Sequence, residues 1–544
     1  MNTAVIRRIA ASILILAWTW SVPAITQQLG SIEFATSGAP QTQAAFLEGV
    51  KALHSFQFDE AAVAFRRAQQ ADADFALAYW GEAMSYNHPL WAQQDGDAAR
   101  GVLERLAPTL EGRLAAARLD KEKAFVEAVE RLFYGPADKL ARDTAYSEAM
   151  ARMHARWPDD HEIATFYALS LLGTVRPGDT GFKRQALAAS IVMDVFAENP
   201  QHPGAAHFII HSFDDPEHAP LALPAARVYA SIAPSAPHAL HMPSHIFVQI
   251  GMWDEVVKSN TVAYRAAVEL NERMHLAEGR EDFHTLSWLT YANLMLGKFD
   301  AAKANVELAQ QAALRNPDNA AVQTGYLGMR ARYMLETEQW EEIPIDAVHA
   351  GSAASSMPGM TMALDGGNAW LFAAGMSAAQ RGDPAAADAV AAALEGRRAS
   401  TEASGNTYAA KAIAILQNEV AALAAAARGR HDAAARLAKQ AVQIELTMNA
   451  PSGPPDPIKP ALELYGELLL AANRPAEAVA AFEQSLLRTP KRTPSLLGLA
   501  RAAAAAEDDR KARQTYSELA DMPGAAASSP AVREARNFLA SHGG

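Results

Sequence analysis

The sequence predicts an all-α protein built as a superhelical solenoid of degenerate helix pairs. Long alanine-rich stretches with leucine, glutamate and arginine favour helices, and no run of alternating β-branched residues bounded by turns is present. A pattern of small and aromatic residues recurs near both ends of the chain with a period of 34 residues. Two histidine pairs with helical i, i+4 spacing, His207/His211 and His241/His245, are separated by the same period.

The first 24 residues have the features of a cleaved secretory signal. Arg7 and Arg8 precede an apolar run over residues 9–20, and small residues follow at 22–24. The apolar run is shorter than the roughly 20 residues that a membrane span needs, which favours cleavage over retention as an anchor. We therefore expect a signal peptide at 1–24, an N-terminal extension at 25–42, and a periplasmic or secreted protein without stable membrane insertion after cleavage.

The amino-acid composition limits the metal ligands, nucleophiles and binding partners that the protein can use. The chain has no cysteine, so disulfides, thiolate metal ligands and cysteine nucleophiles are excluded, and any transition-metal site must use histidine and carboxylates. Lysine and arginine number 48 against 61 acidic residues, and removal of Arg7 and Arg8 with the signal would leave a net charge of −15. This balance disfavours non-specific binding to nucleic acid or to an anionic membrane.

The first repeat follows the N-terminal extension. Gly49, Ala61, Phe65 and Ala68 have the spacing with which small residues let two helices approach while an aromatic ring fills the space between them. This signature resembles the tetratricopeptide-repeat (TPR) family. The pattern returns late in the chain at Gly466, Ala478, Phe482 and Pro490, and once more at Ala512 and Tyr516.

Degenerate helix pairs are expected between these copies. They fall at residues 166–199, 204–232, 238–270, 283–314, 367–394 and 407–446. A glycine- and serine-rich stretch at 351–359 separates two groups of them. We therefore expect an N-terminal TPR-like array with histidine-rich repeats at 43–345, a linker at 346–365 and a C-terminal TPR array at 366–544.

Several short motifs also resemble a subgroup of bacterial secreted TPR proteins. They are Leu53-His54-Ser55-Phe56, Ala78-Tyr79-Trp80-Gly81, His88-Pro89-Leu90-Trp91, His241-Met242-Pro243-Ser244-His245, and Lys459-Pro460 followed by Gly466-Glu467. The resemblance supports the repeat fold. It implies no activity.

The TPR resemblance implies which side chains face the concave groove, because positions 2, 5, 9, 12 and 13 of each first helix do so in that family. His238, His241 and His245 fall at positions 2, 5 and 9 of one repeat, His207, His211, Asp214 and Asp215 at 5, 9, 12 and 13 of the preceding one, and His284 at position 2 of the following one. His54 and His88 both fall at position 13. Nine of the 16 histidines lie between residues 202 and 284. Such clustering is typical of a polar groove lining rather than a helix–helix core.

Three interpretations of this cluster stay open. His207, His211, His241 and His245 could converge on one ion, zinc or copper with four histidines, or iron, manganese or nickel if Asp214 or Asp215 joins. The histidines could instead line a neutral or pH-sensitive groove for a peptide or small anion, or serve as structural hydrogen-bond donors. Pro243 would interrupt the helix that carries His241 and His245 and could redirect both rings.

Other candidates for ligand binding lie elsewhere in the predicted groove. Glu463 and Glu467 occupy positions 5 and 9 of a late repeat, with Arg501 in the next repeat, and they suit either a polar binding patch or a salt-bridge network between repeats. Trp80 and Tyr291 could stack on a ligand or serve as packing residues.

No nucleotide-binding glycine motif, serine nucleophile motif or H-E-x-x-H motif occurs, so the sequence leaves open whether the protein is an enzyme. The leading hypothesis is an exported TPR protein whose concave groove binds a protein, peptide or small ligand. The alternative is a metalloprotein that holds zinc, copper or iron in the histidine-rich site, with metal-dependent hydrolysis as the activity that such a site suggests. A third hypothesis is a structural module of an envelope complex.

Overall fold

The computed structural model describes residues 27–277, 279–280, 282–343 and 366–542. The first helices are α1 (Gln43–His54), α2 (Phe58–Ala71), α3 (Ala76–Met84), α4 (Gly96–Leu106), α5 (Leu110–Ala116), α6 (Asp120–Phe133), α7 (Lys139–Arg156), α8 (His161–Leu172) and α9 (Lys183–Glu198). They are followed by α10 (Pro203–Ser212), α11 (Ala219–Ile232), α12 (Pro237–His241), α13 (Pro243–Gln249), α14 (Trp253–Arg273), α15 (Phe283–Met295), α16 (Phe299–Arg315) and α17 (Ala320–Thr337).

The remaining helices form the C-terminal array. They are α19 (Gly366–Gln380), α20 (Pro384–Ala403), α21 (Thr407–Ala427), α22 (His431–Glu445), α23 (Ala461–Ala471), α24 (Pro475–Arg488), α25 (Thr493–Ala505), α26 (Asp509–Ala520) and α27 (Pro530–His542). Short 3₁₀ helices occur at η1 (Pro40–Thr42) and η2 (Pro89–Trp91). In the described part of the chain, the strands are two-residue segments, β1 (Asn87–His88) and β2 (Gln93–Gln94), paired antiparallel across η2.

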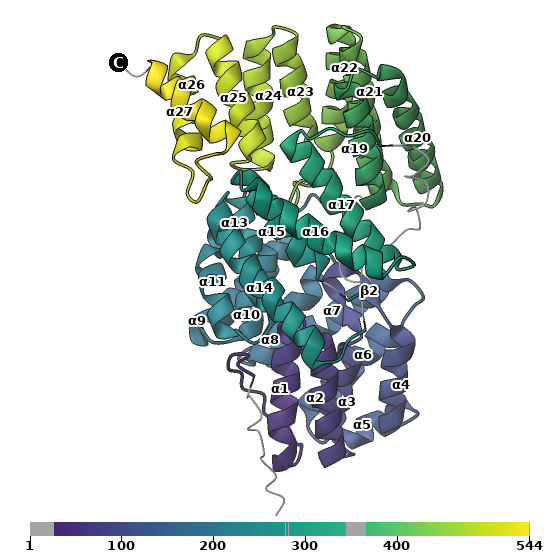
Figure 1. Cartoon of the computed structure of the whole chain (residues 1–544). Helices are drawn as coiled ribbons and strands as arrows, with labels where there is room; N and C mark the ends of the chain where they lie inside the picture. Colours follow the sequence, from purple (N-terminus) through teal and green to yellow (C-terminus); the bar gives the residue numbers. More distant parts are fainter. Residues whose placement is uncertain (1–26, 278, 281, 344–365, 543–544) are drawn as a thin grey trace, which may run out of the picture.

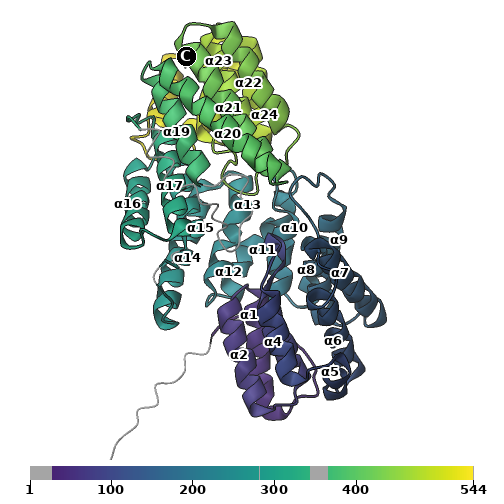
Figure 2. The ribbon, with the colours of Figure 1, turned by 90° about the vertical axis from the view of Figure 1, so that its right-hand side faces the viewer.

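The fold is an all-α solenoid of antiparallel helix pairs, as the sequence predicts. Consecutive helices pack against one another throughout, and the expected pairs correspond to α8/α9, α10/α11, α12–α13/α14, α15/α16, α19/α20 and α21/α22. Figure 1 shows helices α1–α14 in the lower part of the molecule, α19–α27 in the upper part, and α15–α17 between them. In Figure 2, α19–α24 again lie at the top and α1 and α2 at the bottom, while α15–α17 lie at the left near α14.

Phe65 of α2 shows why small residues are needed in these repeats. A methyl group added at Gly49 of α1 would lie 2.8 Å from the Phe65 ring, and one added at Gly81 of α3 would lie 2.3 Å from it. Phe65 itself is fully buried. The aromatic ring therefore joins three successive helices, and glycine lets them approach it.

The same arrangement recurs late in the chain. Phe482 of α24 is fully buried, and methyl groups at Gly466 of α23 and Gly498 of α25 would lie 2.9 and 2.3 Å from its ring. The two aromatic positions that the sequence pattern identifies therefore make equivalent contacts. This repetition supports TPR-type packing in both arrays.

The N-terminal helix pairs curve back on themselves. Helix α1 packs against α10, nine helices later in the chain. At the end of α14, Arg273 forms an ion pair of 2.8 Å with Glu60 of α2. The first helices therefore lie against the later helices α10 and α14 of the same array.

The segment before α1 is part of this closed turn. The backbone nitrogen of Ser31 donates to the backbone oxygen of Gln201 at 2.9 Å. Leu29 and Phe34 are buried in the same core as the first helices. Residues 27–42 thus run along the repeats, while the predicted signal peptide (1–24) and the linker (346–365) lie outside the described residues.

Pro243 divides the fourth predicted helix pair as its chemistry requires. Helix α12 ends at His241 and α13 begins at Pro243, since proline has no backbone N–H to continue the hydrogen-bond ladder. Both short helices pack against α14. The three histidines of this repeat are therefore carried by two short helices instead of one.

The C-terminal array contacts the N-terminal array through its helix turns. Trp253 at the start of α14 donates from its indole nitrogen to the backbone oxygen of Lys491 at 3.0 Å. The hydroxyl of Thr493 donates to the backbone oxygen of Met295 at 2.6 Å. These buried or half-buried contacts fix the turn before α25 against the ends of α13 and α15.

One described helix, Thr407–Ala427, has the length and apolar composition of a membrane span. It lies between α20 and α22, and 56% of its most apolar window is buried inside the protein. Such burial is typical of a core helix.

We predict that Gly81→Ala will lower the thermal unfolding midpoint, because the added methyl group overlaps the enclosed Phe65 ring. Overpacking of this kind costs about 1–3 kcal/mol. Gly101→Ala is the matched control, since Gly101 lies in α4 with nothing near the added methyl group, and the change should raise stability by about 0.5–1 kcal/mol. Circular dichroism melts compare the two variants. Equal midpoints would contradict the packing role of Gly81.

Candidate metal centre

Six histidines from the four helices α10, α12, α13 and α15 meet in the N-terminal repeats. They form two groups of three, within each of which one potential ligand atom per residue lies within 4.8 Å of the others. The first triad consists of His207 and His211 of α10 and His238 of α12. The second triad consists of His241 of α12, His245 of α13 and His284 of α15.

In the first triad, the closest ligand atoms are Nε2 of His207 and Nε2 of His238, 3.1 Å apart. The ring of His211 lies 4.7 Å from that of His207 and 6.3 Å from that of His238, centroid to centroid. His207 is fully buried, whereas His211 and His238 are half-buried.

The second triad has a similar geometry. Nε2 of His241 lies 3.0 Å from Nε2 of His245. The His284 ring lies 4.4 Å from the ring of His241 and 5.8 Å from that of His245. His241 and His245 are buried, and His284 is half-buried.

The two triads are neighbours in one continuous cluster. The rings of His211 and His245 are 5.9 Å apart, and those of His238 and His241 are 6.3 Å apart. Neither separation exceeds the largest separation inside the first triad, 6.3 Å. One interpretation of the sequence places His207, His211, His241 and His245 around a single ion. In the structure the two pairs belong to different triads, and each triad also contains a histidine of the following repeat.

Hydrogen bonds on the outer side of the rings orient three of the histidines. Nδ1 of His207 lies 2.6 Å from the backbone oxygen of His54. Nδ1 of His245 lies 2.6 Å from Oδ2 of Asp214, and Nδ1 of His241 lies 2.5 Å from Oδ1 of Asn260. Each oxygen accepts a hydrogen bond from Nδ1–H, which leaves Nε2 with a free lone pair and is the usual arrangement around metal-binding imidazoles.

The contact between His241 and His245 is the most informative of the cluster. Asn260 donates from Nδ2 to the backbone oxygen of Val256 at 2.9 Å, which orients its Oδ1 toward His241. With both Nδ1 atoms protonated, the two Nε2 atoms face each other as acceptors at 3.0 Å. This contact is repulsive unless a proton or a cation lies between them. Two nitrogens bound to one ion at 2.0–2.1 Å are roughly 3.3 Å apart at a tetrahedral angle.

Burial keeps the cluster in the neutral form that binds metals. Burial lowers the pKa of five triad histidines well below the ordinary 6.5, and unfavourable interactions with neighbouring imidazoles lower it further. The five are His207, His211, His238, His241 and His284. Nε2 of His211 and Nδ1 of His284 are buried atoms without a hydrogen-bond partner among the described residues.

Aromatic rings enclose the cluster. Phe56, in the turn after α1, lies 4.4 Å from the ring of His207, and Trp288 of α15 lies 4.3 Å from the ring of His245. These apolar faces limit the access of water to the imidazoles. The low local polarity strengthens the interaction of their lone pairs with a cation.

The predicted carboxylate ligands lie outside both triads. Asp214 contacts the outer nitrogen of His245, so it orients a ligand instead of providing one. Asp215 pairs with His218 at 2.9 Å. Among the described residues, the two triads therefore offer imidazole nitrogens alone, a donor set that suits zinc or copper better than manganese.

A third polar group lies deeper in the same repeats. Glu162 of α8 is fully buried and contacts Nε2 of His54 at 2.8 Å and Nε2 of His202 at 3.1 Å. Burial acts to raise the pKa of Glu162, but its interactions with the two histidines outweigh this effect and lower it to about 2. His54 is therefore a buried partner of Glu162, and not the groove-facing residue that the repeat frame predicts. We interpret this group as a hydrogen-bonded support for α1, α8 and α10.

Three other side chains that the sequence suggests as ligands are packed against other residues of the protein. Trp80 is fully buried against Phe125, at 4.9 Å between ring centroids, so it does not reach the concave surface. His88 stacks on Phe58 at 4.1 Å. Tyr291 is also buried. None of these three residues belongs to a metal-ligand group of the described chain.

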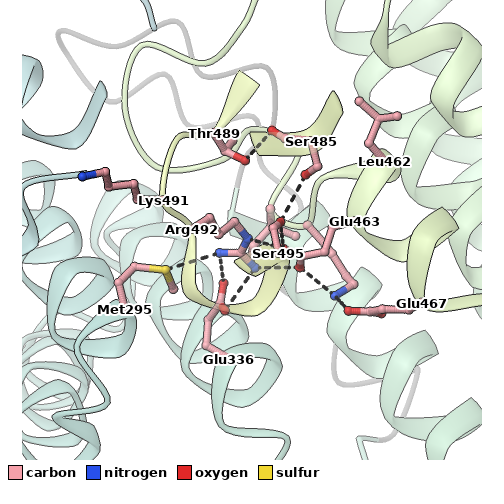
Figure 3. A network of polar contacts seen from close by, with 12 residues as sticks. Met295, Glu336, Leu462, Glu463, Glu467, Ser485, Thr489, Lys491, Arg492 and Ser495 are labelled. Carbon is pink, nitrogen blue, oxygen red and sulfur yellow. Dashed lines mark hydrogen bonds and ion pairs between the residues drawn. The ribbon is translucent and has the colours of Figure 1, made fainter. Parts of the chain in front are cut away.

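Glu463 and Glu467 belong to a salt-bridge network at the junction of the two arrays (Figure 3). Glu463 is fully buried and pairs with Arg492 at 2.8 Å, and the same guanidinium contacts Glu336 of α17 at 2.7 Å. Lys459 joins Glu463 to Glu467, at 2.9 Å from each.

Arg492 lies at the centre of this network and is nearly inaccessible to solvent, although it lies outside the repeat pattern of the sequence. Arg501 does not contact Arg492 and instead pairs with Glu534 of α27 at 2.6 Å. These contacts agree with the salt-bridge alternative for Glu463, Glu467 and Arg501.

Comparisons with solved structures give matches of low identity and low TM-score. No family model and no curated protein matches it. Yeast Tom70 is 12% identical, with a TM-score of 0.28 over 92% of this chain and 95% of that one. A human IFIT1 dimer with m7Gppp-AAAA is 11% identical, with a TM-score of 0.34 over 94% and 90%. The TPR domain of P58(IPK) is 11% identical, with a TM-score of 0.21 over 87% and 99%. Likeness of this size carries no functional argument, and function must be inferred from the residues themselves.

Glu419 of α21 adds a titratable group near the salt-bridge network. It is fully buried, and neither of its carboxyl oxygens has a hydrogen-bond partner among the described residues. Burial raises the pKa of Glu419 well above 4.5, and the nearby carboxylates of Glu445, Glu467 and Glu463 raise it further against the opposing effect of Lys459. The folded chain therefore favours the neutral acid.

We predict that Glu419→Gln will stabilise the protein increasingly as the pH rises above 4.5. Unfolding of the parent protein releases a proton in this range, which lowers its stability by about 1.4 kcal/mol per pH unit up to the raised pKa. The glutamine variant lacks this loss. Denaturant titrations between pH 4.5 and pH 8 measure the difference in unfolding free energy between parent and variant. The control is Glu518→Gln, which changes an exposed glutamate of α26. Parallel pH profiles for parent and variant would contradict the neutral state of Glu419.

Proposed function

We propose that this protein binds two transition-metal ions side by side, one in each histidine triad, and that the ions are zinc or copper. The observation that carries this proposal is the 3.0 Å contact of the His241 and His245 Nε2 atoms, whose Nδ1 atoms both face oxygen acceptors. A cation between the two nitrogens converts this repulsion into two coordinate bonds. The 3.1 Å approach of His207 and His238 is the matching contact of the first triad.

The donor sets also suit a reactive centre. Three protein nitrogens leave one coordination position of a tetrahedral ion available to a small molecule, as in catalytic zinc sites. An ion held in this way can polarise a bound ligand or lower the pKa of bound water. This supports the metalloprotein alternative, with hydrolysis as one reaction that such a centre can perform.

Binding of a protein or peptide on the concave surface is the second candidate. Repeat arrays present extended surfaces of this kind. The two proposals differ in their dependence on the histidines. A partner captured equally well by a protein without both triads would favour a groove-binding role.

Export is part of the proposal. The features of residues 1–24 support a cleaved signal and a periplasmic or secreted location. Intact mass measurement of protein from the exported fraction tests it. A mature chain that begins near residue 25 is the expected result, and a chain retaining Arg7 and Arg8 would contradict cleavage.

We predict two equivalents of zinc or copper per chain in tag-free protein. His238→Ala should remove one equivalent by disrupting the first triad, and His284→Ala should remove one by disrupting the second. Both side chains are half-buried, so helicity should persist. Elemental analysis and circular dichroism measure these outcomes. His218→Ala, which alters a histidine outside both triads, is the control.

Either of two results would overturn the two-metal proposal. If the parent protein is folded and still free of metal after incubation with zinc and copper, the triads do not bind metal. Equal metal contents in the parent, His238→Ala and His284→Ala proteins would place the ions elsewhere.

We predict that Asp214→Ala will weaken metal binding by about 10–100-fold, because the carboxylate orients His245 through Nδ1. The adjacent Asp215→Ala removes the same charge from a residue that contacts His218 and should leave affinity unchanged. Competition with a chromogenic chelator gives both affinities. Equal losses in the two variants would show that charge alone matters and would contradict the orienting role.

A further inference from the structure

The two triads are adjacent, and each offers imidazole nitrogens alone. We propose, on the basis of the two-metal function above, that the resident ions are copper and that the pair binds dioxygen between them. The inference rests on the all-imidazole donor set, the adjacency of the triads and the aromatic rings that contact them.

The donor set favours ions of low charge. All six candidate ligands are imidazoles. Two carboxylates of the described chain contact triad histidines: Asp214 at Nδ1 of His245, and Asp282, which accepts a hydrogen bond from the backbone N–H of His284. Two divalent ions would place four positive charges beside these two acids, whereas two cuprous ions place two, and burial of uncompensated charge is costly. Imidazole also suits copper, which exceeds zinc in affinity for nitrogen sites.

Adjacency allows a small ligand to bridge the ions. His211 and His245 belong to different triads, yet their rings are 5.9 Å apart, and the rings of His238 and His241 are 6.3 Å apart. Metal pairs that share a substrate are typically about 3.5–4 Å apart. With three nitrogens supplied to each ion, one open position per ion remains, and a diatomic molecule can occupy both.

Aromatic side chains lie beside the imidazole rings of both triads and leave little room for a large substrate. Phe56 contacts His207, His211 and His238, with ring separations of 4.4, 5.8 and 5.3 Å. Trp288 contacts the second triad from the opposite side, at 4.3 Å from His245.

A loop of the C-terminal array closes this region further. Trp288 is held by Gly453, where an added methyl group would lie 2.4 Å from the indole. The neighbouring Pro451 accepts a hydrogen bond of 2.8 Å from Gln249. Gln249 in turn lies 3.4 Å from Oδ1 of Asp214. Aromatic rings and this loop therefore lie close to the imidazoles, which favours a small, neutral ligand.

The reaction balances without a further reactant. Each cuprous ion gives one electron and becomes cupric, and dioxygen accepts both electrons and is held between the ions as the peroxide dianion. The O–O bond stays intact, no proton is transferred, and total charge is conserved. Release of dioxygen reverses the step.

The test uses the full-length, tag-free mature protein loaded with copper, reduced with ascorbate under argon, freed of the reductant and then exposed to dioxygen. We expect uptake of one dioxygen per two coppers and a new near-ultraviolet absorption band. Electron paramagnetic resonance should detect only a small fraction of the cupric ions, because a bridging ligand couples their unpaired spins. His218→Ala should behave in the same way.

Single-triad variants provide the matched comparison. His284→Ala and His238→Ala should each retain one copper that gives a full spin count after oxidation with ferricyanide, and they should show no two-copper uptake of dioxygen. This outcome would show that reactivity requires both triads.

Other outcomes separate this inference from the metal-binding proposal. Two bound coppers with a full cupric spin count and no dioxygen uptake would overturn dioxygen binding and leave the two-metal function intact. Two retained zinc ions and no retained copper would do the same. Failure to hold two ions of either metal would overturn both.

Discussion

Nδ1 of His207 lies 2.6 Å from the backbone oxygen of His54, a residue 153 positions earlier in the chain. This contact exists because the N-terminal repeats curve until α1 packs against α10. It fixes the Nε2 atom of His207 toward His238, and the same closure brings Phe56 over the first triad. The curvature of the solenoid, which small residues at the helix contacts permit, therefore brings the first helices and the Phe56 ring against the first triad.

Protonation is unfavourable in most of the histidine cluster. Burial and the neighbouring rings lower the pKa of five of its six imidazoles, those of His207, His211, His238, His241 and His284. Outer acceptors such as Asp214 and Asn260 keep protons on Nδ1 and leave the inner nitrogens as lone pairs. A bound cation relieves the repulsion among these lone pairs. Metal binding should therefore contribute to the stability of the closed N-terminal turn, since the unfolded chain cannot hold the same ligands together.

The sequence is sufficient to predict the repeats and most of the candidate ligands. Phe65 and Phe482 fall where the 34-residue pattern places them, and the expected helix pairs appear. The repeat frame also contains the rule for the triads, because each combines positions 5 and 9 of one repeat with position 2 of the next. His238 and His284 complete the triads for this reason. The pairing was not predicted, because Pro243 divides the helix and sequence periodicity does not specify ring orientation.

Long-range contacts explain the other differences. His54 and Glu162 are 108 residues apart and meet because the repeats curve, so Glu162 resembles an ordinary helix-start acid in the sequence. Arg492 lies outside the repeat pattern and becomes the centre of the inter-array network through contacts with distant Glu336.

The most direct test of the central claim is anomalous X-ray diffraction at the metal absorption edge from crystals of metal-loaded protein. The structure predicts two anomalous peaks, one bound by His207, His211 and His238 and the other by His241, His245 and His284, with metal–nitrogen distances near 2.0–2.1 Å. A single peak shared by the two i, i+4 pairs, or peaks only outside the histidine cluster, would contradict it.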